Sequence, residues 1–142
     1  MINFYFETKF NFSGKNHIKI WIKNIIESNR LVVGNINYIF VDDEQLLKIN
    51  NQFLSHDYFT DIITFNFCKD GIINSDIYIS IERIKENSHI FKTTFKEEFL
   101  RVIIHGILHL LGFNDSTKEE QKSMRQQENN LLLKIDQSKI KL

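Results

Sequence analysis

Residues 94–115, TFKEEFLRVIIHGILHLLGFND, decide the fold of this chain. Thr94 and Glu97 have the spacing of a capping box, in which two side chains bond the free backbone N–H groups at the start of a helix. The positions that follow are apolar on nearly every face of that helix: Phe99, Leu100, Val102, Ile103, Ile104, Ile107, Leu108, Leu110 and Leu111. Such a helix has no polar face to present to water, so we expect it at the centre of a domain.

The rest of the chain supplies strands and amphipathic helices that can surround this centre. Apolar alternation and β-branched or aromatic residues predict strands near residues 2–6, 36–40, 61–67 and 77–81. Apolar residues three and four apart predict helices near residues 18–26, 42–53, 84–91 and 116–135. We therefore expect an α+β fold with a single domain over residues 1–142. It should hold about four strands in a mixed sheet and about five helices around the central one.

Two local details follow from the same patterns. The helix near residues 42–53 should begin at Asp42 or Asp43 and turn Leu46, Leu47, Ile49 and Phe53 inward. The last few residues, which end at Leu142, should fray.

Composition excludes several classes of protein. The 142 residues are 42% hydrophobic and 25% charged, which is typical of a globular domain and not of a disordered chain. Lys and Arg number 18 and Asp and Glu also number 18, so any contact with nucleic acid needs a local patch and not an overall basic field. Cys68 is the only cysteine, which excludes an internal disulfide. We expect no signal peptide and no membrane span, and hence a cytoplasmic protein.

Two histidines four residues apart stand on the central helix. His105 and His109 differ by about 40° of rotation and about 6 Å of rise, so both rings leave the same face. Gly112 can end the helix in the left-handed conformation and let the chain bring Asp115 back as a third ligand. The spacing predicts a site for zinc or another first-row divalent metal, with one position open for water. The alternative is a pair of core histidines, with Asp115 capping the next helix.

The spacing is also similar to that of small zinc metallopeptidases. In those enzymes a Glu beside the first His acts as the general base. Gly106 occupies that position here and cannot accept a proton, which disfavours a peptidase. The sequence is still compatible with a hydrolase that depends on metal-activated water.

The same residues resemble the signature of the YbeY family, bacterial single-strand-specific endoribonucleases of ribosomal RNA maturation. The family pattern His-Gly-x-Leu-His-Leu-x-Gly-Tyr-Asp-His matches residues 105–115 except at its last three positions. Residues 60–67 and 76–83 resemble two of the family's strands, and Met124 and Glu128 match in the last helix.

This resemblance implies a metal-dependent endoribonuclease that cleaves single-stranded RNA during 16S rRNA maturation. His105, His109 and Asp115 would hold the metal, and either its water or the RNA 2′-hydroxyl would attack the phosphodiester. The implied partners are an rRNA precursor and the small ribosomal subunit or its assembly factors. The competing hypothesis is a non-catalytic, ribosome-associated assembly factor in which the metal is structural.

Two positions depart from the family's pattern. Asp115 stands where the family has His, and Leu54 stands where it has an Arg that is thought to meet phosphate. Arg101, one turn before His105, is a speculative catalytic replacement for that Arg. Further candidates for RNA contact are cations that could line a groove and aromatic rings on which bases could stack: Lys85, Lys92, Lys96, Tyr58 and Phe59. The lysines could equally be ordinary solvated residues.

Three other side chains are candidates for a role near the metal. Glu98 could orient a metal ligand or pair with Arg101. His56 and Asp57 precede the third strand, and a site role for either is a guess.

Overall fold

The computed structural model describes residues 1–56 and 58–142, so Asp57 lies outside the described residues. The described elements are β1 (Ile2–Phe6), α1 (Lys15–Ser28), β2 (Val32–Val41), α2 (Asp43–Leu54), β3 (Ile62–Asn66), β4 (Ile72–Ser80), α3 (Ile81–Ile90), α4 (Phe95–Leu110), α5 (Lys118–Leu132) and a short 3-10 turn (Gln137–Lys139). This order of strands and helices, and the α+β class, are those predicted from the sequence. Within the described residues, no helix is long and apolar enough to cross a membrane.

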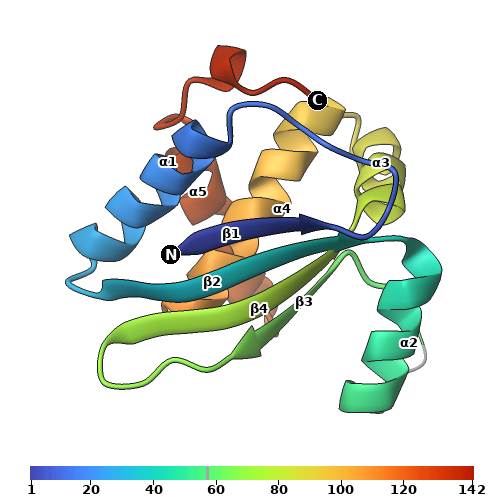
Figure 1. The fold of residues 1–142 in the computed structure, drawn as a ribbon, viewed down its shortest axis with the longest axis horizontal. Helices are drawn as coiled ribbons and strands as arrows, with labels where there is room; N and C mark the ends of the chain where they lie inside the picture. Colours follow the sequence, from blue (N-terminus) through green and yellow to red (C-terminus); the bar gives the residue numbers. More distant parts are fainter. Residues whose placement is uncertain (57) are drawn as a thin grey trace.

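The four strands form one mixed sheet in the order β1-β2-β4-β3 (Figure 1). β1 pairs with β2 and β2 with β4 in parallel, whereas β3 pairs with β4 antiparallel. The turn from β3 to β4 passes through Asp70 and Gly71, whose φ angles of 53° and 77° suit a tight turn between antiparallel strands. β3 is an edge strand, and this places it beside the residues that follow α4.

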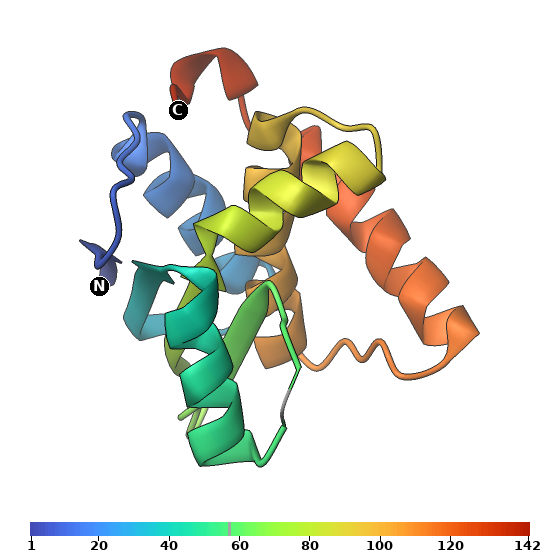
Figure 2. The same cartoon turned by 90° about the vertical axis from the view of Figure 1, so that its right-hand side faces the viewer.

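α4 is the central helix that the sequence predicts. It runs between the sheet on one side and α5 on the other (Figure 2). The Tyr38 hydroxyl, buried in β2, donates a hydrogen bond to the Ile103 carbonyl oxygen at 2.9 Å and so ties the helix to the sheet. The ring of Phe99, on α4, packs against the ring of Phe40, on β2, with 5.7 Å between centroids and 31° between planes. The two histidine candidates for metal ligands therefore lie on a helix that is fixed on two sides.

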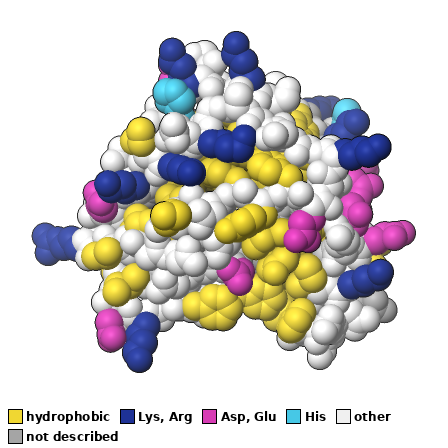
Figure 3. All heavy atoms as spheres, viewed as in Figure 1, with side chains coloured by type: hydrophobic (Ala, Val, Ile, Leu, Met, Phe, Trp, Pro, Cys, Tyr) yellow, Lys and Arg dark blue, Asp and Glu magenta, His cyan; other side chains and the backbone are white. Residues whose placement is uncertain are grey.

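The opposite face of the sheet is only partly covered. α2 buries a second, smaller core against Ile39, Val41 and Ile63. Beside this core the aromatic rings of Phe53, Phe67 and Tyr78 each pack against the ring of Phe65. Hydrophobic side chains gather at the surface of this face (Figure 3).

Two local predictions were wrong. Phe53 is 62% exposed: it lies in the last turn of α2, where its ring meets that of Phe65 on β3, and Asn50 takes the inward position instead. The last residues are packed and not frayed, since Ile140 is fully buried and Lys141 forms a β-bridge with Ser13. The predicted cap at Asp42 is confirmed, with Gln45 completing a capping box.

Candidate metal centre

The end of α4 sets the position of the third ligand. Gly112 has a φ of 102°, and its N–H bonds the His109 carbonyl while the N–H of Phe113 bonds the Leu108 carbonyl. These two bonds form a Schellman motif, which reverses the chain at a helix end. A Cβ on Gly112 would meet no atom within 4 Å, so the glycine is needed for its backbone angle and not for space. The reversal carries Asp115 back toward the helix.

Three donor atoms converge at this point. Nε2 of His105 lies 3.0 Å from Nε2 of His109, and each lies 3.3 Å from Oδ2 of Asp115. Three ligands of one tetrahedral zinc ion at about 2.1 Å would themselves be about 3.4 Å apart. The triangle therefore fits a single ion of that size, and the donor set of two imidazoles and one carboxylate suits zinc or a similar metal.

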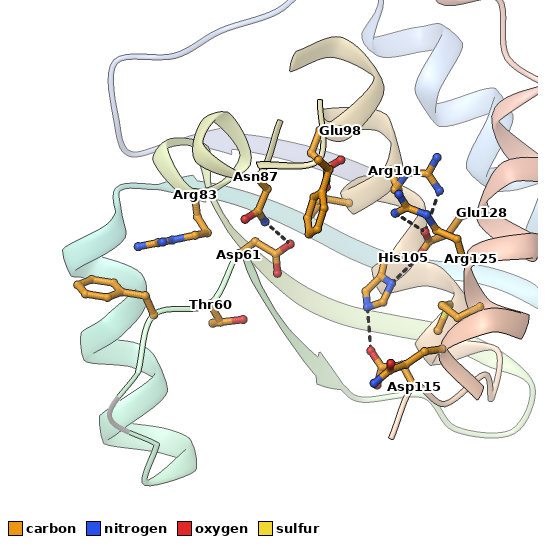
Figure 4. Close-up of a pocket in the computed structure, with 15 residues that line it drawn as sticks. Thr60, Asp61, Arg83, Asn87, Glu98, Arg101, His105, Asp115, Arg125 and Glu128 are labelled. Carbon is orange, nitrogen blue, oxygen red and sulfur yellow. Dashed lines mark hydrogen bonds and ion pairs between the residues drawn. The ribbon is translucent and has the colours of Figure 1, made fainter. Parts of the chain in front are cut away.

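A buried carboxylate orients the first of these histidines. Oε2 of Glu128, on α5, accepts a hydrogen bond from Nδ1 of His105 at 2.7 Å (Figure 4). Oε1 of Glu128 accepts another from Arg101 at 3.0 Å, and Arg101 also donates to Asn129 at 2.8 Å. Because Nδ1 carries the proton, Nε2 is left with its lone pair facing Asp115.

The electrostatic environment at His105 favours positive charge. Burial acts to lower the pKa of this imidazole, but the hydrogen bond that it donates to Glu128 and the charges of Glu128, Asp61 and Asp115 raise it. The raising effects prevail, so the pKa lies above its ordinary value. The same carboxylates would stabilise a bound cation.

Gly106 packs closely against the sheet. A Cβ at this position would come within 3.1 Å of Ile62 and 3.3 Å of Thr64, both on β3. A longer side chain would therefore need these two side chains to shift. Gly106 itself supplies no group that could act as the general base of a metallopeptidase of this kind.

Two cavities meet at the candidate metal centre. The first, of about 570 Å³, lies between α3, α4 and α5, and the second, of about 560 Å³, runs along β3. They share four lining residues: Thr60, Asp61, His105 and Asp115. The donor atoms thus face a continuous groove and not a closed core.

Two further carboxyl groups line the first cavity. Burial raises the pKa of Asp61, which accepts a hydrogen bond from the side-chain amide of Asn87 at 3.3 Å. Burial also raises the pKa of Glu98, which is 4% exposed and accepts from the Thr93 hydroxyl at 3.4 Å. Glu98 makes no described contact with a metal-ligand candidate; the orienting contact that we considered for it is made by Glu128.

Other candidates from the sequence lie in different settings. Arg101 is 6% exposed and engaged by Glu128 and Asn129, although its Nε is buried without a partner among the described atoms. Leu54 and His56 line the second cavity, where the described residues include no Lys or Arg. Lys85, Lys92 and Lys96 line neither of the two cavities as described. Phe59 lines the first cavity and Tyr58 the second.

Comparison with known proteins agrees with this geometry. The model of the family described as "Endoribonuclease YbeY" matches residues 4–136. The chain belongs to the YbeY family. Among its YbeY relatives, the protein called endoribonuclease YbeY from Christiangramia forsetii is 47% identical over 127 residues, which are 89% of each chain. The endoribonuclease YbeY of Flavobacterium psychrophilum is 43% identical over 132 residues, 93% of this chain and 94% of the relative.

A solved structure resembles the fold as well. The solution structure of TM1509 from Thermotoga maritima matches with a TM-score of 0.65 and 29% sequence identity. The match covers 94% of this YbeY chain and 91% of the other.

Proposed function

We propose that the chain is a metal-dependent endoribonuclease that cleaves single-stranded RNA during ribosomal RNA maturation. The observation that carries the proposal is the convergence of His105, His109 and Asp115 on one point at the floor of a groove, in a chain of the endoribonuclease YbeY family. A groove, and not a closed pocket, suits a polymer whose ends extend beyond the site.

We infer zinc as the ion, held by Nε2 of each histidine and by Oδ2 of Asp115. When bound, such an ion supplies a Lewis acid for a phosphodiester oxygen and activates a nucleophile at neutral pH. Glu128 holds His105 in the tautomer that the site requires, and Arg101 holds Glu128. We therefore assign Arg101 a positioning role, because both of its terminal nitrogens already bond protein atoms.

The partners that we propose are an rRNA precursor and the small ribosomal subunit or its assembly factors. A purely structural metal in an assembly factor is the competing function. The groove disfavours it, because a structural site is closed by protein ligands, whereas the third ligand here is 42% exposed. Gly106, packed against β3, disfavours a peptidase.

The test is cleavage of a labelled single-stranded RNA, beside the matching duplex and an unstructured protein. We expect cleavage of the single strand alone, loss of cleavage on chelation, and recovery when zinc is added back. The variant His109→Ala should bind little metal and cut no RNA. Equal cleavage by wild type and His109→Ala would overturn the proposal, since a contaminating nuclease would then explain the activity.

A further inference from the structure

Two exposed aromatic rings line the same cavity as the metal-ligand candidates. Phe59, in the segment before β3, is 50% exposed, and Phe91, at the end of α3, is 54% exposed. Both border the cavity of about 570 Å³ that also contains His105 and Asp115. Exposure of half a ring costs hydrophobic stabilisation, so these phenylalanines are not explained by core packing.

Each ring has an arginine beside it. Cζ of Arg83 lies 5.0 Å from the ring centroid of Phe59, and Cζ of Arg125 lies 6.0 Å from that of Phe91. Arg83 is fixed in turn, because its Nη2 lies 2.6 Å from Oδ2 of Asp43. Figure 4 shows Arg83 and Arg125 on opposite sides of Asp61 and His105. The cavity thus contains the same pair of groups twice, a ring with a guanidinium beside it.

These pairs have the chemistry of a nucleotide site. A base stacks on an aromatic face whatever its sequence, and a nearby guanidinium adds cation–π attraction and a contact for phosphate. The cavity volume lies within the range of about 300–1,000 Å³ that holds ligands of nucleotide size. The described lining of the neighbouring cavity along β3 has no Lys or Arg, so of the two cavities this one offers the cationic contacts.

We propose that Phe59 and Phe91 are stacking platforms for two bases of the RNA strand, with Arg83 and Arg125 beside them. The inference rests on the proposed function, because it names how the same groove selects its substrate. A base in a duplex is already stacked on both faces and cannot lie against a protein ring. Two platforms beside the metal centre therefore select for single strands without reading sequence.

The test measures, by fluorescence anisotropy, the binding of a labelled single-stranded hexanucleotide with 2′-O-methyl riboses. Phe59→Ala and Phe91→Ala should each raise Kd about five- to a hundredfold. Phe67→Ala is the matched control, because Phe67 is 58% exposed and lines neither cavity. It should change Kd less than about twofold. Phe59→Trp and Phe91→Trp should keep or tighten binding, which separates stacking from damage to the fold.

A second probe isolates the bases. The same strand with abasic sites should bind wild type more weakly, and neither alanine variant should weaken it further. Equal Kd values for wild type, Phe59→Ala and Phe91→Ala on the intact strand would overturn the inference. It would also be overturned if the alanine variants lost as much affinity for the abasic strand as for the intact one. Cleavage of an unmodified strand is measured separately. If wild type cuts RNA and the alanine variants bind it as tightly as wild type does, only the stacking role of Phe59 and Phe91 is refuted. If the alanine variants lose binding but wild type does not cut RNA, only the proposed function is refuted.

Discussion

Nδ1 of His105 lies 2.7 Å from Oε2 of Glu128, although the two residues are 23 positions apart and belong to different helices. This contact connects the candidate metal centre on α4 to the packing of α5. The second oxygen of Glu128 accepts from Arg101, which lies one turn before His105 on the same helix. The three side chains, of which Arg101 and Glu128 are buried, form a chain of hydrogen bonds that sets the direction of the imidazole lone pair.

Glu128→Gln should weaken metal binding by about 10- to 100-fold, because an amide is a poorer acceptor for the His105 N–H and no longer balances Arg101. Competition with a chromogenic zinc chelator measures the change. Glu119→Gln is the matched control, since Glu119 is exposed on the same helix. Equal zinc affinity in wild type and Glu128→Gln would show that the carboxylate does not tune the site.

Asp115→Ala should remove one of three ligands, and elemental analysis should find metal falling from about one equivalent to a small fraction of that. Asp115→His offers an imidazole in place of the carboxylate and should retain the ion. RNA cleavage should follow metal content across the three proteins. If Asp115→Ala lowers the melting temperature but leaves cleavage unchanged, the metal is structural. That result would favour the competing hypothesis of an assembly factor with a structural metal.

Glu98→Gln should stabilise the protein at neutral pH. Burial raises the folded-state pKa of Glu98 above its unfolded value, so the stability contributed by the protonated form is lost as the pH rises through the folded pKa. The amide stays neutral and avoids this loss. The melting temperature of the variant should therefore exceed that of wild type at pH 7, and the gap should close as the pH falls to 4.5 and below.

Glu86→Gln is the control for that comparison, because Glu86 is exposed on α3. It should show no such difference across the same pH range. If the difference in melting temperature between Glu98→Gln and wild type widened on acidification, the pKa of Glu98 could not be raised in the folded state.

Gly112→Ala should lower the free energy of unfolding by about 1–2 kcal/mol, because an alanine is strained at a φ of 102°. Relief of that strain would shift the turn and displace Asp115, so zinc affinity should fall as well. Denaturant titration and chelator competition measure the two effects. Asn114→Ala, an exposed change in the same turn, should alter neither, and Gly112→Asn should cost less than the alanine.

The sequence predicted the parts of this molecule that depend on local pattern. The central helix, the glycine that ends it and the candidate ligand triad all follow from spacing within residues 94–115. The order of the strands could not be predicted, because it depends on which edges pair across the whole chain. Glu128 was missed as the partner of His105 for the same reason, although its match to the YbeY pattern in the last helix was a usable signal.

Small errors had equally physical causes. The helix predicted from about residue 116 begins at Lys118, with Thr117 and Glu120 as its capping box, because two overlapping motifs, Ser116 with Glu119 and Thr117 with Glu120, satisfy the same rule. Phe53 has the spacing of a buried residue, but it lies in the last turn of α2, where its ring meets that of Phe65 on the edge strand β3 and most of it stays exposed.

The three candidate metal ligands all lie within residues 105–115, one short and continuous piece of chain. An ion bound there would cross-link only a small loop, and the conformational entropy that a cross-link removes from the unfolded chain grows with loop length. Removal of the metal should accordingly abolish RNA cleavage but leave the tertiary structure intact. Folding and metal binding can then be separate events: the apoprotein folds first and becomes active when it binds the metal.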